Sequence, residues 1–384
     1  MKTNRLYIPI LALALAAGFT SCDDFLDREP MSTVDPEVYF TQVSQLESYA
    51  NQLYENILPS HGNWSYGIFG EDSGTDNQTG ATANNRFAEG LWKVPNKDDD
   101  NWKFEWIYRC NFFLQNVLEK YGTKEDGSEN TIMGDLASIK HYIGEIYFLR
   151  AYEYFKRYQK YGDFPIITEP LADDMEILRE SNKRMPRTEV ARFILDDLKK
   201  AYDFLSAKEM ATTRINKDAA LLLRSRVALF EGTWLKSFEG TAFVPNGEGW
   251  PGASKDYNKD YQFKSGSIDK EINYFLEQAI ADAETISEAY KNDLAENKGL
   301  QQSVNDPANP YYDMFAQEDL SGVREVLLWR QYGRGLVTHN VNVAANRGNY
   351  MNGVTRAFVN NFLMDDGTPV YTHGNYADGD EYYK

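Results

Sequence analysis

The chain has 384 residues, of which 42% are hydrophobic, and its formal net charge is −18. That length allows one large domain or two ordinary ones with a real core. The charge excludes nucleic acid as a partner, because phosphates are bound by lysine and arginine, and it disfavours electrostatic binding to anionic lipid. It favours neutral or cationic ligands, or serves solubility alone.

Residues 1–21 have the features of an export signal. Two basic residues precede an uncharged apolar run over residues 6–19, and small residues then lead into Cys22. The run is shorter than the roughly 20 residues that a membrane-spanning helix needs. A cysteine at the cleavage point indicates lipid attachment, so we predict a lipoprotein signal peptide over 1–21 and a lipid anchor at Cys22. An ordinary secretory signal is the alternative.

Six segments space their apolar residues by three and four, which is typical of helices. They are Pro36–Ile57, Trp102–Tyr121, Leu136–Tyr161, a helix beginning at Arg187-Thr188, Asn216–Leu235 and Ile268–Tyr290. We expect Asp35 and Thr188 to be N-caps. Arg150 and Arg226 lie on otherwise apolar helices, where each is expected to form a buried structural ion pair.

After residue 303 the long segments with helical spacing of apolar residues give way to shorter segments. Val323–Tyr332 and Gly335–Val343 are predicted to be short strands or extended segments, and Thr355–Phe362 a short helix. The long helices carry small residues on their packing faces, as in helix-pair solenoids, although no clean repeat period is present. The chain is therefore predicted to be mainly α.

Long loops rich in aromatic, glycine and polar residues interrupt the helices. Their aromatic residues argue against disorder, and long loops inside compact domains are often functional. Sugars stack their C–H faces on tryptophan and tyrosine, and their hydroxyls need polar side chains nearby. The candidate ligand-binding residues are Trp64, Tyr66, Asp72, Asp76, Asn77, Arg86, Trp92, Trp250, Tyr257, Asn346 and Arg347. For each of them, the alternative role is to anchor its loop onto the helices.

No catalytic or metal-binding motif is found. The four histidines have no metal-ligand spacing, and neither a nucleophile elbow nor a dinucleotide fingerprint is present. We therefore predict no enzyme activity, no cofactor and no metal. A glycoside hydrolase stays open as an alternative, because 58 acidic residues could include a catalytic pair. Cys110 lies among apolar residues at helical spacing, so we expect a buried, unreactive thiol.

Six short motifs follow one another along the chain. They are Cys22–Asp27 with Pro30; Trp102–Ile107 with Cys110-Asn111; Gly144–Phe155 with Tyr161–Pro165; Arg187-Thr188 with Ile194–Leu198; Arg214–Ala220 with Arg224, Arg226 and Leu229; and Phe362–Gly367. In this order they resemble the SusD/RagB family, the surface nutrient-binding lipoproteins of Bacteroidetes-type bacteria.

The resemblance implies a tetratricopeptide-like helical-pair core, about 36–58, 99–236 and 268–290, within one SusD-like domain over 22–384. It also implies a ligand-binding subdomain formed by large irregular loops, about 59–98, 237–267 and 303–384. The family typically continues beyond this length, so we expect the chain to be C-terminally incomplete.

The function that the resemblance implies is nutrient uptake at the cell surface. The lipoprotein would sit on the outer membrane, bind an oligosaccharide and deliver it to a SusC-like TonB-dependent transporter, over which it acts as a lid. A peptide-binding member of the same family is the closest alternative. A helical-repeat interaction scaffold without a small-molecule pocket is another.

Overall fold

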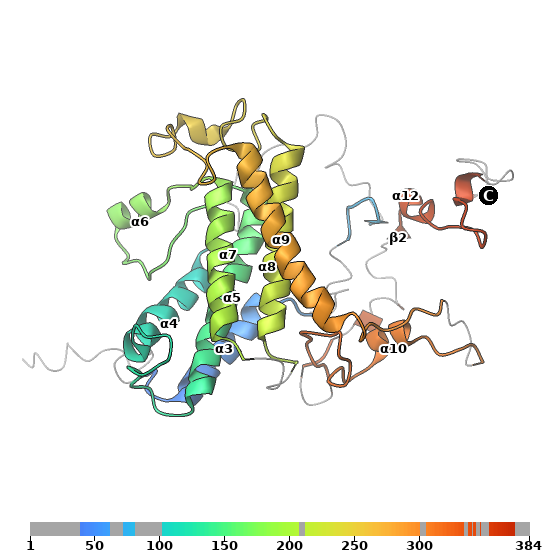
Figure 1. Cartoon of the computed structure of the whole chain (residues 1–384), viewed down its shortest axis with the longest axis horizontal. Coiled ribbons are helices and arrows are strands. Elements are labelled where there is room, and N and C mark those ends of the chain that lie inside the picture. Colours follow the sequence, from blue (N-terminus) through green and yellow to red (C-terminus); the bar gives the residue numbers. More distant parts are fainter. Residues whose placement is uncertain are drawn as a thin grey trace, which may run out of the picture.

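Six long helices form the core of the computed structural model (Figure 1). The structure describes residues 39–61, 72–80, 102–206, 212–299, 305–333, 337–339, 341–342, 346 and 353–372. The long helices are α3 (Val43–Ile57), α4 (Glu105–Tyr121), α5 (Leu136–Tyr161), α7 (Arg187–Phe204), α8 (Lys217–Ser237) and α9 (Ile268–Tyr290). The prediction of a mainly α fold is confirmed.

Several shorter elements accompany these helices. They are α6 (Met175–Ser181), the 3₁₀ turn η3 (Pro251–Ser254), α10 (Pro310–Ala316), α12 (Arg356–Val359) and the 3₁₀ turn η4 (Val370–Thr372). Strands β1 (Gln78–Thr79) and β2 (Gly353–Val354) pair antiparallel, with Gln78 opposite Val354. The sequence did not predict α6 or α10.

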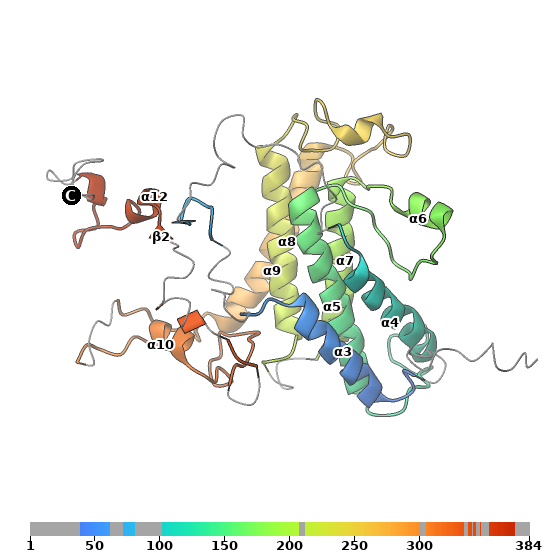
Figure 2. The same ribbon diagram turned by 180° about the vertical axis from the view of Figure 1, so that it is seen from behind.

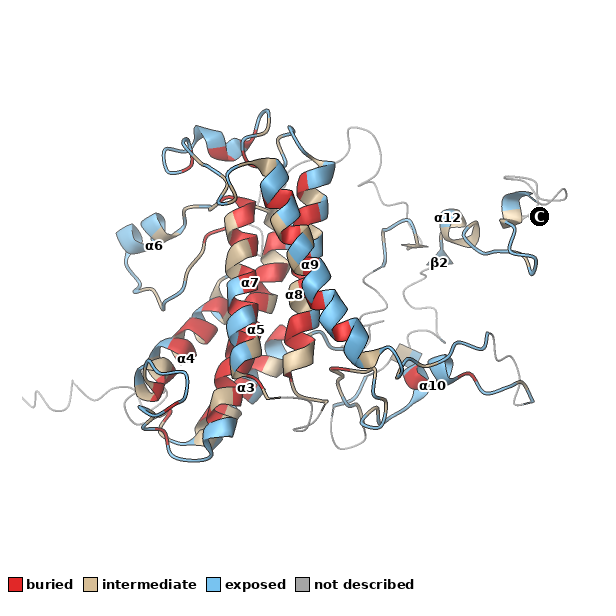
Figure 3. Ribbon diagram, in the orientation of Figure 1, coloured by how far each residue is buried: buried red, intermediate tan, exposed pale blue. Residues whose placement is uncertain are grey.

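The central helix is α5, which contacts α3, α4 and α7, while α8 packs on α7 and α9 packs on α8. The view from behind shows the same arrangement (Figure 2). Because α5 has neighbours on three sides, nearly all of its residues from Ile139 to Phe155 are buried (Figure 3). Each further helix covers the exposed face of the one before it, as in a helix-pair solenoid.

Two glycines allow the helices to approach closely. A Cβ atom on Gly144 of α5 would lie 2.8 Å from Cγ and 2.9 Å from the backbone nitrogen of Leu205, at the end of α7. A Cβ atom on Gly232 of α8 would lie 2.8 Å from Leu276 of α9. These contacts are the structural counterpart of the small residues that the sequence places on the packing faces.

Buried or half-buried ion pairs join the helices to one another and to the adjoining loop. They are Arg150–Asp197 between α5 and α7, Arg187–Glu231 between α7 and α8, Arg192–Glu271 between α7 and α9, Arg224–Asp282 between α8 and α9, and Arg214–Glu145 between the loop before α8 and α5. Side-chain hydrogen bonds to charged groups are worth about 1.5–3 kcal/mol each. Because Arg150 pairs with Asp197 and both residues are buried, the prediction of a buried structural ion pair at Arg150 is confirmed.

The prediction for Arg226 is wrong. Its side chain is exposed on α8 and makes no hydrogen bond or ion pair with any residue that the structure describes. The helical register explains this, because Arg224 is the arginine of α8 that faces α9 and reaches Asp282.

Three predicted helix starts are also corrected. Helix α4 begins at Glu105 instead of Trp102, with Phe104 as its N-cap residue. Helix α3 begins at Val43, because Phe40 has a left-handed backbone (φ 61) and turns its buried ring into the core. The Gln45 side chain accepts a hydrogen bond from the Gln42 backbone, which stabilises this later start. Asp35 lies outside the described residues. Thr188 is no N-cap, since α7 begins one residue earlier and the Thr188 hydroxyl lies 2.5 Å from that of Tyr261.

The segment 323–332, predicted to be a short strand or extended, begins with a turn at Val323–Val326 and is extended after it. It pairs with no strand of the described chain. It lies against the helices, and we call residues 325–331 the strap. Only parts of 335–343 are described. Thr355 caps the predicted short helix, which forms as α12.

Cys110 is buried in α4, and burial raises the pKa of its thiol. Since the thiolate is the reactive form, we expect no reaction with Ellman's reagent (DTNB) in the native Cys22→Ala variant, which keeps Cys110 of the two cysteines, and full reaction in urea. Measuring thionitrobenzoate release during a urea titration checks this, and fast labelling without urea would contradict it.

Within the described residues, no helix is both long and apolar enough to cross a membrane.

Candidate functional site

Several residues predicted from the sequence lie outside the described part of the chain. These are Cys22, Trp64, Tyr66, Arg86, Trp92 and Arg347. Their roles stay predictions. Asn346 is described and exposed.

Asp72, Asp76 and Asn77 lie together in the turn that leads into β1. Asp72 and Asp76 are exposed, and the Asn77 carbonyl accepts a hydrogen bond from the Thr355 backbone at 2.9 Å. With the β1–β2 pairing, this contact brings the first loop next to the segment before α12. The structure thus joins two of the three predicted loop regions at exposed, polar residues.

Trp250 and Tyr257 differ in accessibility although they share one loop. The Trp250 ring is 4% exposed, and its indole N–H donates a hydrogen bond to Asp163 at 2.8 Å. Burial raises the pKa of the Asp163 carboxyl, and the Trp250 hydrogen bond opposes that shift. In this arrangement Trp250 anchors its loop at the end of α5. Tyr257 is 41% exposed and accessible to a ligand.

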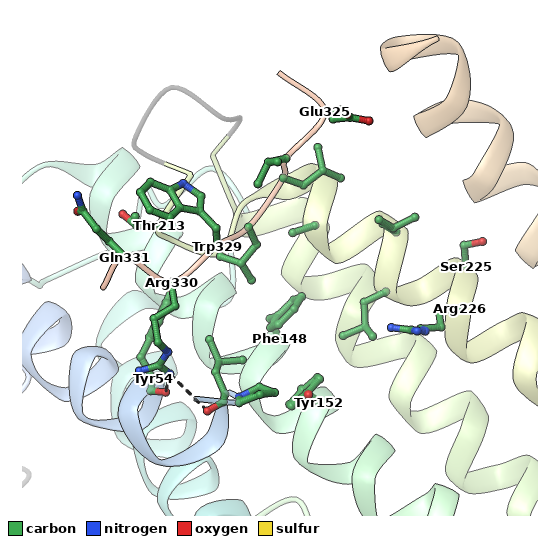
Figure 4. Close-up of a pocket in the computed structure, with 18 of the residues that line it drawn as sticks. Tyr54, Phe148, Tyr152, Thr213, Ser225, Arg226, Glu325, Trp329, Arg330 and Gln331 are labelled. Atoms are coloured by element: carbon green, nitrogen blue, oxygen red, sulfur yellow. Dashed lines mark hydrogen bonds between the residues drawn. The ribbon is translucent and has the colours of Figure 1, made fainter. Parts of the chain in front are cut away.

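A groove of about 1120 Å³ runs along one face of the helical core (Figure 4). Its walls come from the C-terminal end of α3, from α5, from the N-terminal half of α8 with the loop before it, and from the strap. The lining includes Tyr54, Leu58, Phe148, Tyr152, Thr213, Leu222, Arg226, Leu229, Glu325, Trp329, Arg330 and Gln331.

Hydrogen bonds hold the strap in place. The Trp329 backbone and indole N–H groups donate to the carbonyl and hydroxyl oxygens of Thr212, at 3.1 and 2.7 Å. The Asn216 side chain, at the start of α8, donates to the Leu327 carbonyl at 2.6 Å. The Arg330 guanidinium donates to the Tyr54 and Leu58 carbonyls at 3.2 and 3.4 Å. A cation at a helix C-terminus also interacts favourably with the helix dipole.

The groove walls combine aromatic rings with exposed aliphatic side chains. Phe148 and Tyr152 stack on each other along α5, with ring centroids 6.5 Å apart. On α8, Leu222 and Leu229 are 46% and 51% exposed. Arg226 lies between them on the same face, since residues three or four apart are helix-surface neighbours. The groove thus offers apolar contact area with a cation on its α8 wall.

Some polar side chains of the groove have no hydrogen-bond partner within the described chain. Arg226 and Gln331 make no hydrogen bond with a described residue and are available to a ligand. Tyr54 is not available, because its hydroxyl donates to Glu145 at 2.5 Å and accepts from the Ile215 backbone at 2.7 Å. Burial, followed by the Glu145 charge, raises the pKa of Tyr54 well above its ordinary range.

None of the groove residues was among the predicted ligand-binding residues. The available signal was Arg226, a charged residue that the sequence places on an otherwise apolar helix. Among the described residues, no group of three or more histidine, cysteine or acidic side chains could hold a metal ion.

Comparisons with known proteins agree on one family. A SusD-like family model described as "Starch-binding associating with outer membrane" matches residues 24–229. Two curated SusD-like proteins of Formosa agariphila are 26% and 25% identical, over 234 and 258 residues. These matches cover 56% and 65% of this chain and 41% and 47% of the relatives, so the chain spans less than half of their length.

A solved structure shows the same fold. The crystal structure of a SusD-like carbohydrate-binding protein from Bacteroides fragilis has a TM-score of 0.57 and 15% sequence identity, covering 88% of this chain and 56% of that one. The family match includes more than half of this chain and most of the helices that build the groove. The chain therefore belongs to the SusD-like family, as the six sequence motifs predicted.

Proposed function

We propose that this protein is a lipoprotein on the outer face of the outer membrane that binds oligosaccharide and delivers it to a SusC-like TonB-dependent transporter. Residues 1–21 act as its signal peptide and Cys22 carries the lipid. Residues 22–384 form one SusD-like domain, whose irregular loops contribute to ligand binding. The observation that carries the proposal is the match of the starch-binding family model to α3, α5 and most of α8, which wall the groove.

The groove fits an extended neutral glycan in size and in chemistry. Ligand pockets typically enclose about 300–1,000 Å³, so a groove of about 1120 Å³ takes several sugar units. The half-buried ring of Tyr152 offers a face for C–H stacking, and the buried Phe148 packs against it. Arg226 and Gln331 line the same groove and supply hydrogen-bond donors for hydroxyls. Capture needs no catalytic residue, and we propose that the chain binds without hydrolysis.

Substitutions in the groove test this proposal. Tyr152→Ala and Arg226→Ala should each weaken retardation in native gels containing the bound glycan by about three- to tenfold, because each removes one stacking surface or donor. Phe315→Ala is the matched control, since Phe315 is an exposed ring of α10 that does not line the groove. Equal retardation of all three variants would show that the glycan binds elsewhere.

The aliphatic part of the wall favours a second candidate, binding of a peptide. Leu222 and Leu229, with Arg226 between them, suit an extended or helical peptide with apolar side chains and one carboxylate. Leu222→Ser then weakens peptide binding strongly and glycan binding little, because hydroxyl-rich rings gain less from an aliphatic contact. Fluorescence anisotropy with labelled acidic, leucine-rich peptides separates the two candidates.

A further inference from the structure

A second pocket, of about 330 Å³, opens between the start of α4, residues 167–171 and α6. It shares no lining residue with the groove. Both ribbon views place α4 and α6 on the opposite side of the core from α10 and the segment that follows it (Figures 1 and 2). None of its residues was among the predicted ligand-binding residues.

One wall of this pocket is aromatic and is held firmly. Phe104 stacks on the buried Phe164, with ring centroids 5.1 Å apart and planes 15° apart. Trp102 meets the same Phe164 edge to face at 4.8 Å, and the Arg184 guanidinium lies 5.4 Å from the Trp102 ring. Tyr108, one helical turn beyond Phe104, is 46% exposed. These rings are therefore fixed before any ligand arrives, which lowers the cost of binding.

The rim of the pocket is polar and has unused hydrogen-bonding capacity. Buried Asn111 donates hydrogen bonds to the Ile167 and Glu169 carbonyls, at 2.9 and 3.3 Å, and so fixes the backbone that carries Glu169. The Glu169 carboxylate itself makes no hydrogen bond within the described chain. The same holds for the side-chain amide of Asn182, which lines the pocket just after α6.

We propose that this pocket binds one neutral hexose unit, separately from the groove, an inference that rests on the proposed function. An aromatic wall beside a carboxylate and an amide is the chemistry that recognises a sugar ring, with C–H groups on one face and hydroxyls at the edge. The pocket volume lies at the lower end of the usual size range for ligand sites, which fits one sugar ring. Glu169 repels anionic sugars, because no described cation pairs with its carboxylate.

The test uses saturation-transfer NMR on the purified mature protein, which detects weak ligands. The probes are methyl glycosides of glucose, galactose and mannose, with methyl glucuronide as the anionic counterpart. At least one neutral glycoside should receive saturation that depends on Tyr108, and the glucuronide should receive no Tyr108-dependent saturation. Tyr108→Ala and Glu169→Ala should each raise the dissociation constant about five- to tenfold. Glu169→Gln should admit the glucuronide, because the repelling charge is gone.

Phe315→Ala serves as the control and should leave the signal unchanged. In the groove variant Tyr152→Ala, the Tyr108-dependent part of the signal should persist. The proposal that this pocket binds a hexose is overturned if no neutral glycoside receives saturation. It is also overturned if the Tyr108→Ala variant binds the glycoside as tightly as the unsubstituted protein does. Loss of the signal in Tyr152→Ala alone would likewise overturn it and assign the sugar to the groove. The two proposals fail separately. Glycan retardation without a Tyr108-dependent glycoside signal removes only the pocket proposal. A Tyr108-dependent signal without glycan retardation removes only the proposal that the groove binds oligosaccharide.

Discussion

Arg150→Met is expected to lower the free energy of unfolding by about 3–5 kcal/mol, because it leaves a buried carboxylate without its cation. The Arg150 guanidinium donates to both oxygens of Asp197, each at 2.7 Å, and to the Asn111 side chain at 2.8 Å. Asp197 is fully buried between α5 and α7. Methionine fills similar space but donates no hydrogen bond. Urea denaturation followed by circular dichroism measures the loss as a shift in midpoint at constant slope.

Arg226→Met is the matched control for this experiment. The same substitution at an exposed arginine without a described partner should change the free energy of unfolding by less than about 0.5 kcal/mol. Arg150→Met combined with Asp197→Leu should recover part of the lost stability, because no uncompensated charge then remains. A loss below about 1 kcal/mol for Arg150→Met alone would contradict the role assigned to this ion pair.

Glu145→Ala should have an effect of similar size, about 3–5 kcal/mol, because Glu145 joins three parts of the core. Its carboxylate accepts hydrogen bonds from Tyr54 of α3 at 2.5 Å, from His141 at 3.0 Å and from Arg214 at 2.6 and 2.9 Å. All of these donors are left without their acceptor in the variant. Since Tyr54 also lines the groove, ligand binding should weaken together with stability.

The control for Glu145→Ala is Glu119→Ala, which removes an exposed glutamate from neighbouring α4. It should change the free energy of unfolding by less than about 0.5 kcal/mol. Thermal unfolding by calorimetry compares the two variants under identical conditions. Equal melting temperatures for both would show that the Glu145 network does not stabilise the core.

Local sequence signals predicted a helix well where the capping residues and the packing of its apolar face define the same ends. Both ends of α5 and α9 match the prediction, with Asp135 and Ser267 as N-caps and Gly162 ending α5. The start of α3 could not be predicted this way. It depends on the buried ring of Phe40, which contacts Phe113 at 5.3 Å, far away in the sequence.

The sites were harder to predict because they depend on contacts between distant segments. The apolar pattern of 323–332 is the same for a strand and for a segment lying on helices, so the strap could not be foreseen. The groove needs the strap beside α3 and α8, which Arg330 and Asn216 bring about. The aromatic and polar composition of its loop made Trp250 a candidate ligand contact. Its anchoring role follows only from its hydrogen bond to Asp163, which is distant in the sequence.

The central claim is that this chain binds neutral oligosaccharide, and calorimetric titration of the mature protein with a broad glycan panel tests it most directly. The panel contains neutral oligosaccharides of four to eight units, the same glycans carrying sulfate, and acidic leucine-rich peptides. We predict saturable heat with at least one neutral glycan and no release of reducing sugar during the titration. Saturable heat with the peptides alone, or reducing sugar accumulating with time, would contradict the account.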